Sequence, residues 1–205
     1  TVEKNGVQTE PVEYTTGSFS SIKMLYVGDP QIGASKGQTQ GSESLNADSG
    51  AANTAARNDS FGWNRTLEIA AQQNPNLNFI ISAGDQVNKT GQAKEEEYAG
   101  YLSPAVLAGL PVATTIGNHD SSSDAYSKHF QSANESTLGA TKAGGDSYFV
   151  YNGILFLVLN SNNLSTAEHK AFMENAIAAT AEQDIRWKIV VFHHSVSSVA
   201  SHAVD

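Results

Sequence analysis

Short apolar runs rich in β-branched and aromatic residues recur along the chain, and each has the length of a buried strand. These runs predict strands within residues 22–29, 77–85, 111–120, 154–162 and 187–195. The stretch 144–153 predicts a further strand and a turn that leads into the fourth run. Strands that are apolar along their whole length are typical of a sheet covered on both faces.

Helical patterns lie between these runs, at residues 63–73, 94–102 and 166–183. The third pattern is the clearest, because Phe172 and Ala176 fall on one face of a helix. Ser165, followed three residues later by Glu168, has the form of a capping box at the start of this helix. Strands that alternate with helices predict an α/β domain.

Two segments lack these patterns. Residues 33–59 are small and polar with almost nothing to bury, and we expect them to form a long surface loop of the kind that is often functional. Residues 1–21 contain one weak strand, "PVEYTT", and no helical pattern. We therefore expect residues 1–21 to be the tail of a preceding β module or a linker, and residues 22–205 to form the folded domain.

Composition favours one packed domain and excludes several kinds of chemistry. The 205 residues are 40% hydrophobic and 16% charged, which is typical of a globular core. The formal charge of −9 argues against nucleic-acid binding, because there is no basic stripe to displace counterions. With no cysteine, the chain has no disulfides, thiolate ligands or thiol nucleophile. No apolar run approaches the ~20 residues that a membrane helix needs, so we expect no membrane insertion.

Each of the five apolar runs ends in a polar residue that could bind a ligand. These residues are Asp29, Asp85, Asn118, Asn160 and His193. In open α/β sheets, ligands bind beyond the carboxyl ends of the strands, where distant residues meet. Carboxylates, an amide oxygen and an imidazole suit Zn, Mn or Fe. Any one of these residues, taken alone, is better explained as a turn or cap residue. The ordered set, however, favours a metal site, where two ions could acidify a water and clamp both oxygens of an in-line displacement.

Four short motifs carry a resemblance to a known family: "GDPQ", "GDQV", "GNHD" and "FHHSVSSVASH". Together they resemble the ordered motifs of the metallophosphoesterase (calcineurin-like phosphoesterase) superfamily, from about Lys23 to the end of the chain. The branch that looks closest is the purple acid phosphatases and their bacterial relatives. The resemblance implies a layered sheet sandwich flanked by helices. It also implies metal-dependent hydrolysis of small phosphate-ester substrates by a hydroxide that two metal ions activate.

The same resemblance assigns metal ligands. It implies that Asp29 binds one metal ion and that Asp85 bridges two. Asn118 and His193 would hold the second ion through an amide oxygen and a ring nitrogen. His194 is the alternative ligand, because adjacent residues of a strand point to opposite faces. The complete domain would hold two metal ions, each Fe, Zn or Mn.

The resemblance also assigns catalytic residues. His119 matches the family histidine that hydrogen-bonds the phosphoryl group or protonates the leaving oxygen. Asp120 would orient that imidazole from behind, and His202 would lie near the leaving group. His129 and His169 match no motif, and we expect both to be surface or packing residues.

Three departures separate the chain from the family pattern. Gln31 stands where many members carry a ligand histidine, and Asn88 stands where purple members carry a tyrosinate ligand. The terminal Gly-His-x-His motif does not occur, so we expect the domain to be truncated at its C-terminus. These departures leave an alternative function: a non-catalytic surface-binding module that keeps a degraded phosphoesterase fold. The resemblance implies an extracellular or cell-surface location.

Overall fold

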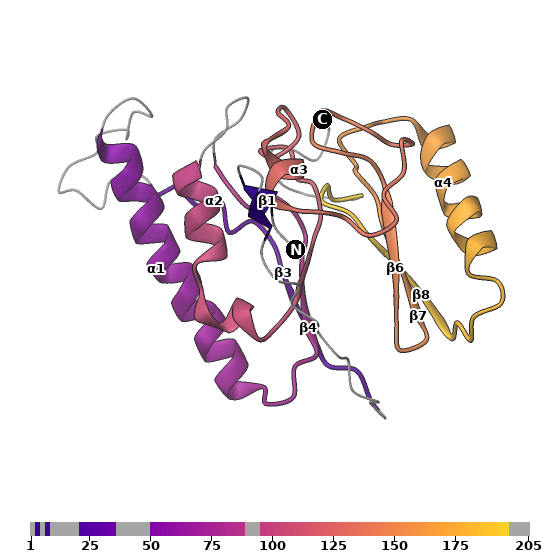
Figure 1. Ribbon diagram of the computed structural model, residues 1–205, viewed down its shortest axis with the longest axis horizontal. Coiled ribbons are helices and arrows are strands. Elements are labelled where there is room, and N and C mark those ends of the chain that lie inside the picture. Colours follow the sequence, from indigo (N-terminus) through magenta and orange to yellow (C-terminus); the bar gives the residue numbers. More distant parts are fainter. Residues whose placement is uncertain (1–2, 5–6, 9–20, 36–49, 89–94, 197–205) are drawn as a thin grey trace.

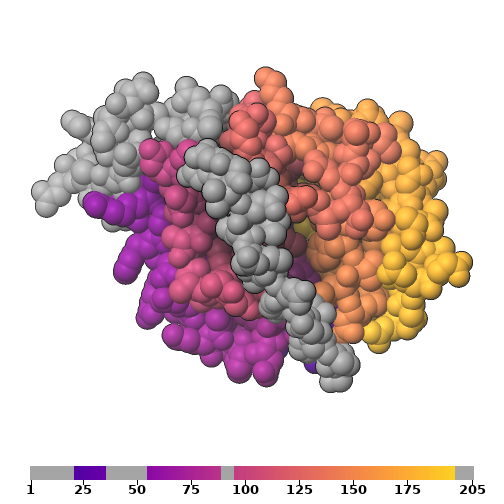
Figure 2. Space-filling model, viewed as in Figure 1, coloured from indigo at the N-terminus to yellow at the C-terminus, as the bar shows by residue number. Residues whose placement is uncertain are grey.

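A computed structural model of the protein describes the structure of residues 3–4, 7–8, 21–35, 50–88 and 95–196. Two three-stranded sheets lie at its centre, with helices on their outer sides (Figure 1). In the space-filling view, the helical half in purple and magenta and the half in orange and yellow form the two sides of the molecule (Figure 2). This mixed α/β architecture confirms the predicted fold class, a layered sheet sandwich flanked by helices.

The first sheet is parallel throughout and has the strand order β3-β4-β5. Its strands are β3 (Met24–Val27), β4 (Phe79–Ser82) and β5 (Val112–Thr114). All four residues of the central strand β4 are buried, as its apolar sequence predicts. Because the strands run in one direction, their carboxyl ends lie at one edge of the sheet.

The second sheet has the order β6-β7-β8. Its strands are β6 (Ser147–Tyr151), β7 (Ile154–Val158) and β8 (Trp187–Val191). β6 and β7 form a hairpin through Asn152 and Gly153, which have φ angles of +46° and +76°. Two successive positive φ angles are typical of the tight turn that matches the twist of a hairpin. β8 runs parallel to β7.

The remaining elements are helices and one short ladder. They are α1 (Gly50–Gln73), α2 (Glu95–Leu102), the 3-10 helix η1 (Ala105–Ala108), α3 (Ala125–His129), α4 (Thr166–Ala179), and the paired strands β1 (Glu3–Lys4) and β2 (Val7–Gln8). No helix within the described ranges is long and apolar enough to cross a bilayer. The weak strand predicted at residues 11–16 lies outside the described residues.

The prediction of a surface loop over residues 33–59 is wrong at its C-terminal end, because α1 begins at Gly50. Ala55 and Ala56 are buried in this helix, and Ala56 packs in the same cluster as Trp63 and Leu67. Alanine has the highest helix propensity of any residue. Its small side chain also permits burial without a long apolar run, so the hydrophobic pattern understated this segment.

α4 begins where its capping residues predict and ends at Ala179, four residues before the predicted end. The Ser165 hydroxyl accepts a hydrogen bond from Glu168 N at 3.3 Å, as in a capping box. The Glu168 carboxylate instead accepts a bond from Gly139 N at 2.9 Å. The helix start is therefore tied to the loop that precedes β6.

The core is layered because successive side chains of a strand point to opposite faces. Ile80 of β4 packs toward the helices, in a cluster with Trp63 and Tyr101. Its neighbours Phe79 and Ile81 pack in the other direction, against Phe156 of the second sheet. A third cluster, which contains Leu155, Leu157, Phe172 and Ala176, joins the second sheet to α4. The two sheets therefore pack face to face between two helical layers.

Candidate metal centre

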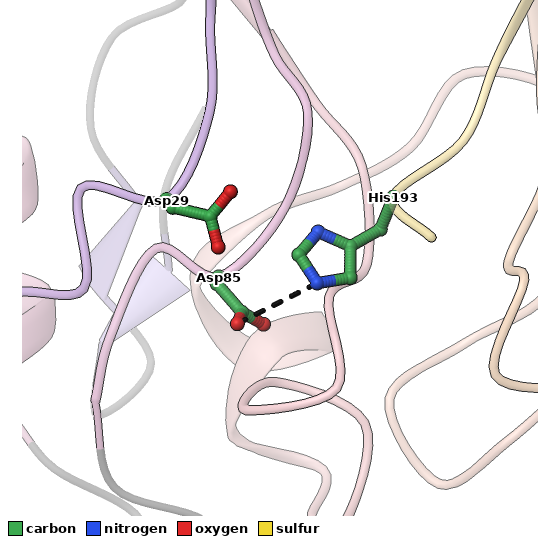
Figure 3. Close-up of side chains that lie close together, drawn as sticks. All are labelled: Asp29, Asp85 and His193. Atoms are coloured by element: carbon green, nitrogen blue, oxygen red, sulfur yellow. Dashed lines mark ion pairs between the residues drawn. The ribbon is translucent and has the colours of Figure 1, made fainter. Parts of the chain in front are cut away.

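The predicted ligands follow the carboxyl ends of four strands. Asp29 follows β3, Asp85 follows β4, Asn118 follows β5 and His193 follows β8. The first three strands end at one edge of the first sheet, and face-to-face packing of the sheets brings the end of β8 to the same place. Figure 3 shows the side chains of Asp29, Asp85 and His193 pointing toward one another.

Asp29, Asp85 and His193 form a group with the spacing of metal ligands. Each offers one ligand atom, and these atoms all lie within 4.8 Å of one another. His193 Nε2 lies 3.5 Å from Asp85 Oδ2 and 2.9 Å from Asn118 Oδ1. The structure therefore brings together all four residues that were predicted to hold metal, and we call Asp29, Asp85, Asn118 and His193 the metal-ligand group.

The donor set of this group fits a cation. The ring of His193 points Nδ1 at the carbonyl oxygen of Ala83, at 2.9 Å, where an Nδ1–H donates. That bond leaves the lone pair of Nε2 facing the oxygens of Asp85 and Asn118. A histidine fixed in this way by a backbone carbonyl is typical of metal sites. Lone pairs that face one another without a proton between them repel, and a positive ion would relieve that repulsion.

The backbone at the centre adopts uncommon conformations. Asp29 and Asp85 have φ angles of +51° and +54°. Positive φ is disfavoured for residues with a side chain, and it persists where the surrounding structure holds it in place. Asp29 N donates to Gly84 O at 3.2 Å, so the two strained turns are tied to each other. Strain of this kind is concentrated at functional sites.

His119 lies at the edge of this group. Its backbone N–H donates to Asp85 Oδ1 at 2.8 Å, and its ring Nε2 lies 3.9 Å from Asp85 Oδ2. Ring Nδ1 meets the backbone carbonyl oxygen of Asn88. The side chain is 27% exposed, so the ring is held on one side and open to solvent on the other.

The expected pairing of Asp120 with the His119 ring is wrong. Asp120 Oδ2 accepts hydrogen bonds from the backbone N–H groups of Gly117 and Asp85, at 3.0 and 2.9 Å, and of Gln86, at 3.4 Å. The chain turns after β5, where Asp120 N donates to Gly117 O at 3.2 Å. Within the described part of the chain, Asp120 Oδ1 has no hydrogen-bond partner.

Burial dominates the electrostatics of Asp120. The residue is 1% exposed, and this desolvation raises the pKa of its carboxyl to about 7. The backbone donor at Gly117 opposes the increase in pKa, and the nearby charge of Asp85 adds to it. Asp120 thus joins the turn after β4 to the turn after β5, and its protonation is sensitive to the charge of the metal-ligand group.

The other candidate histidines lie elsewhere. His194 Nδ1 contacts the Ser161 hydroxyl at 2.8 Å, so the alternative ligand points to the loop after β7. His169 pairs with Asp146 at 2.7 Å, and His129 pairs with Glu95 at 3.1 Å. His202 lies outside the described residues.

Two features of the site were missed in the sequence. The carbonyl that holds His119 belongs to Asn88, whose own N–H donates to Glu97 Oε2 at 3.1 Å. A backbone acceptor leaves no signal in a residue pattern. Asp59 of α1 accepts bonds from Gly33 N and Ser35 N, at 2.9 and 3.0 Å, and so fixes the loop after β3. Its acidic side chain within a polar segment gave no periodic signal.

Comparison with known proteins adds an independent observation. A family model described as calcineurin-like phosphoesterase matches residues 22–205. The matched span contains every residue of the metal-ligand group. Among curated proteins, the comparison found no match.

Proposed function

Because the chain belongs to the calcineurin-like phosphoesterase family, we propose that it hydrolyses small phosphate esters at a metal centre built on Asp29, Asp85, Asn118 and His193. The observation that carries this proposal is the convergence of these four side chains, whose ligand atoms lie within a few ångströms although they follow four different strands. Family membership supports metal-dependent phosphoester hydrolysis in general. The roles of the individual residues are our proposal.

We assign the two ends of the group to two metal ions. Asp29 would hold one ion, Asn118 and His193 would hold the other, and Asp85 would serve both. The side chain of Asp85 is 2% exposed, and its carboxylate lies within 4.8 Å of ligand atoms of both Asp29 and His193, which supports a shared position. When bound, such a pair of ions supplies Lewis acidity and an acidified water for in-line attack on phosphorus.

His119 is proposed as the proton donor to the leaving oxygen. In its imidazolium form, Nδ1–H donates to Asn88 O and leaves Nε2–H on the side of the metal-ligand group. Asp120 acts indirectly, as a positioning residue that fixes the turns carrying Asp85 and Gly117. His202 is proposed to assist at the leaving group, on the strength of the motif alone.

The branch of the family, the identity of the ions and the location of the protein are also proposals. The motif words favour the purple acid phosphatase branch, with Asn88 in place of its tyrosinate ligand. That branch suggests Fe, Zn or Mn as the ions and an extracellular or cell-surface location. It also suggests that residues 1–21 are the tail of a β module or a linker before the phosphoesterase domain.

The test separates chemistry from metal binding by comparing two variants. Hydrolysis of an aryl phosphate and an aryl phosphodiester is measured together with metal content by elemental analysis. His119→Ala should lower turnover by about 10²–10⁴-fold with metal content unchanged, because it removes only a proton donor. Asp85→Asn should lose both activity and metal, since it removes the shared carboxylate.

Asp124→Asn is the matched control for the charge change. Asp124 lies on the surface, 64% exposed and paired with Lys128 at 2.9 Å, so this variant should keep full metal content and activity. If His119→Ala loses metal along with activity, His119 is a ligand or a structural residue instead. If the wild-type protein binds metal and hydrolyses neither ester, the non-catalytic binding module replaces the enzyme as the favoured function.

A further inference from the structure

The side-chain amide of Gln31 lies between the two carboxylates of the metal-ligand group. Gln31 Nε2 is 3.2 Å from Asp85 Oδ2 and 3.5 Å from Asp29 Oδ1. Gln31 is the last residue of the motif "GDPQ" and stands where many members of the family carry a ligand histidine. A proton donor therefore occupies the place where a cation would contact both carboxylates.

The backbone holds Gln31 in place. Gln31 N donates to Asp85 O at 2.9 Å, and the next residue, Ile32, donates to Gln86 O at 3.1 Å. Ile32 is fully buried and forms a bridge with Val87, so the chain on this side cannot move without disturbing the core. Gln31 itself has a φ of +35°, a conformation that persists only where its surroundings impose it.

The chemistry of a primary amide allows two roles at this position. With its NH₂ turned inward, as seen here, Gln31 donates to the carboxylates and offsets their negative charge. Rotation of the terminal amide by about 180° exchanges nitrogen for oxygen without moving the rest of the side chain. The inward atom is then a neutral oxygen that can ligate the same cation as the carboxylates.

We propose that Gln31 ligates, through Oε1, the metal ion held by Asp29 and Asp85, and makes this position selective for Mn²⁺ or Mg²⁺ over Zn²⁺. Carboxylate and amide oxygens suit Mg²⁺ and Mn²⁺, whereas an imidazole at the same place would favour Zn²⁺. The inference rests on the proposed function only in requiring that this group binds a metal ion. It makes no claim about the substrate.

The experiment measures metal affinity and needs no turnover. Mn²⁺ and Zn²⁺ are titrated separately into chelator-treated protein by calorimetry, for the wild type, Gln31→Leu and Gln31→His. Gln31→Leu should weaken Mn²⁺ binding by about 10–100-fold, the range typical of lost support at metal sites. Gln31→His should shift the ratio of Zn²⁺ to Mn²⁺ affinity toward Zn²⁺ by about tenfold or more.

Gln183→His is the matched control, because Gln183 is exposed beyond the end of α4 and the new imidazole lies outside the metal group. Its affinity ratio should equal that of the wild type. The ratio within one variant does not depend on the fraction of folded protein, so a destabilised variant still gives a usable answer.

Unchanged Mn²⁺ affinity in Gln31→Leu overturns the inference, whatever Gln31→His does, and leaves Gln31 as a structural donor. Asp85→Asn distinguishes that result from failure of the proposed function. If Asp85→Asn abolishes binding while Gln31→Leu does not, the metal centre stands and only the role of Gln31 falls. If the wild-type protein binds neither ion, both proposals fail.

Discussion

Replacement of Gly117 by alanine tests whether the metal-ligand group depends on a close approach between two turns. A Cβ at Gly117 would lie 2.0 Å from Asp85 Oδ1 and 2.2 Å from Asp85 N. Atoms in proteins essentially never approach a Cβ closer than 3.0 Å, so the two turns must separate by about 1 Å. Hydrogen bonds also oppose this separation, because Asp120 Oδ2 accepts from the backbone N–H groups of both Gly117 and Asp85.

The expected cost follows from these contacts. Overpacking of a tight site costs about 1–3 kcal/mol. Loss of one bond from Asp120 to a backbone N–H costs about 1–3 kcal/mol, because it leaves a buried polar group without its partner. The two effects overlap, and we expect Gly117→Ala to lower the free energy of unfolding by about 2–4 kcal/mol. For a chain of this size that corresponds to a fall in Tm of roughly 5–15 °C.

The assay combines thermal unfolding with Mn²⁺ titration. Because the displaced atom is an oxygen of the shared carboxylate, Mn²⁺ affinity should fall about tenfold or more along with Tm. Gly62→Ala is the control, since no atom lies within 4 Å of its Cβ position and it is inside α1. In that variant the free energy of unfolding should rise by about 0.5–1 kcal/mol, because alanine has a higher helix propensity than glycine. A destabilisation of 1 kcal/mol would lower Tm by at least about 2 °C. The reasoning is refuted if Gly117→Ala melts within about 2 °C of the wild type and binds Mn²⁺ equally well.

Two further predictions concern the second sheet and its helix. Burial alone would lower the pKa of His169, but hydrogen bonds to Asp146 and to the carbonyl oxygen of Asn163 outweigh burial and raise this pKa. These bonds therefore stabilise the fold fully below about pH 6.5, the pKa of an unfolded histidine. The stabilisation is lost as pH rises through the folded pKa. Urea unfolding should therefore show a larger stability gap between wild type and His169→Gln at pH 6 than at pH 8; equal gaps would contradict the pairing. In the same assay, Phe156→Ala should lower the free energy of unfolding by about 3–5 kcal/mol. Phe156 is fully buried between the sheets, and its ring stacks on that of Phe149 with 4.7 Å between the ring centroids. A decrease below about 1 kcal/mol would contradict the layered core.

The sequence determined the elements whose signals are local. The apolar runs placed the strands, since β-branched and aromatic residues favour a strand whatever it pairs with. Ser165 placed the start of α4, because a cap satisfies backbone donors within three residues of itself. The polar residues at the strand ends gave the metal-ligand group, since parallel strands deliver their carboxyl ends to a common edge.

Tertiary structure decided what depends on contacts between distant residues. The N-terminal half of α1 is helical although its sequence is small and polar, because Ala55 and Ala56 find a core to pack against. The Asp120 carboxylate pairs with backbone N–H groups of the turns after β4 and β5, and not with the adjacent ring of His119. The Gln31 amide lies between two carboxylates only because the turns after β3 and β4 are bonded to each other. Residue patterns report periodicity along one segment, whereas the partner of a polar atom is fixed by the packing of several.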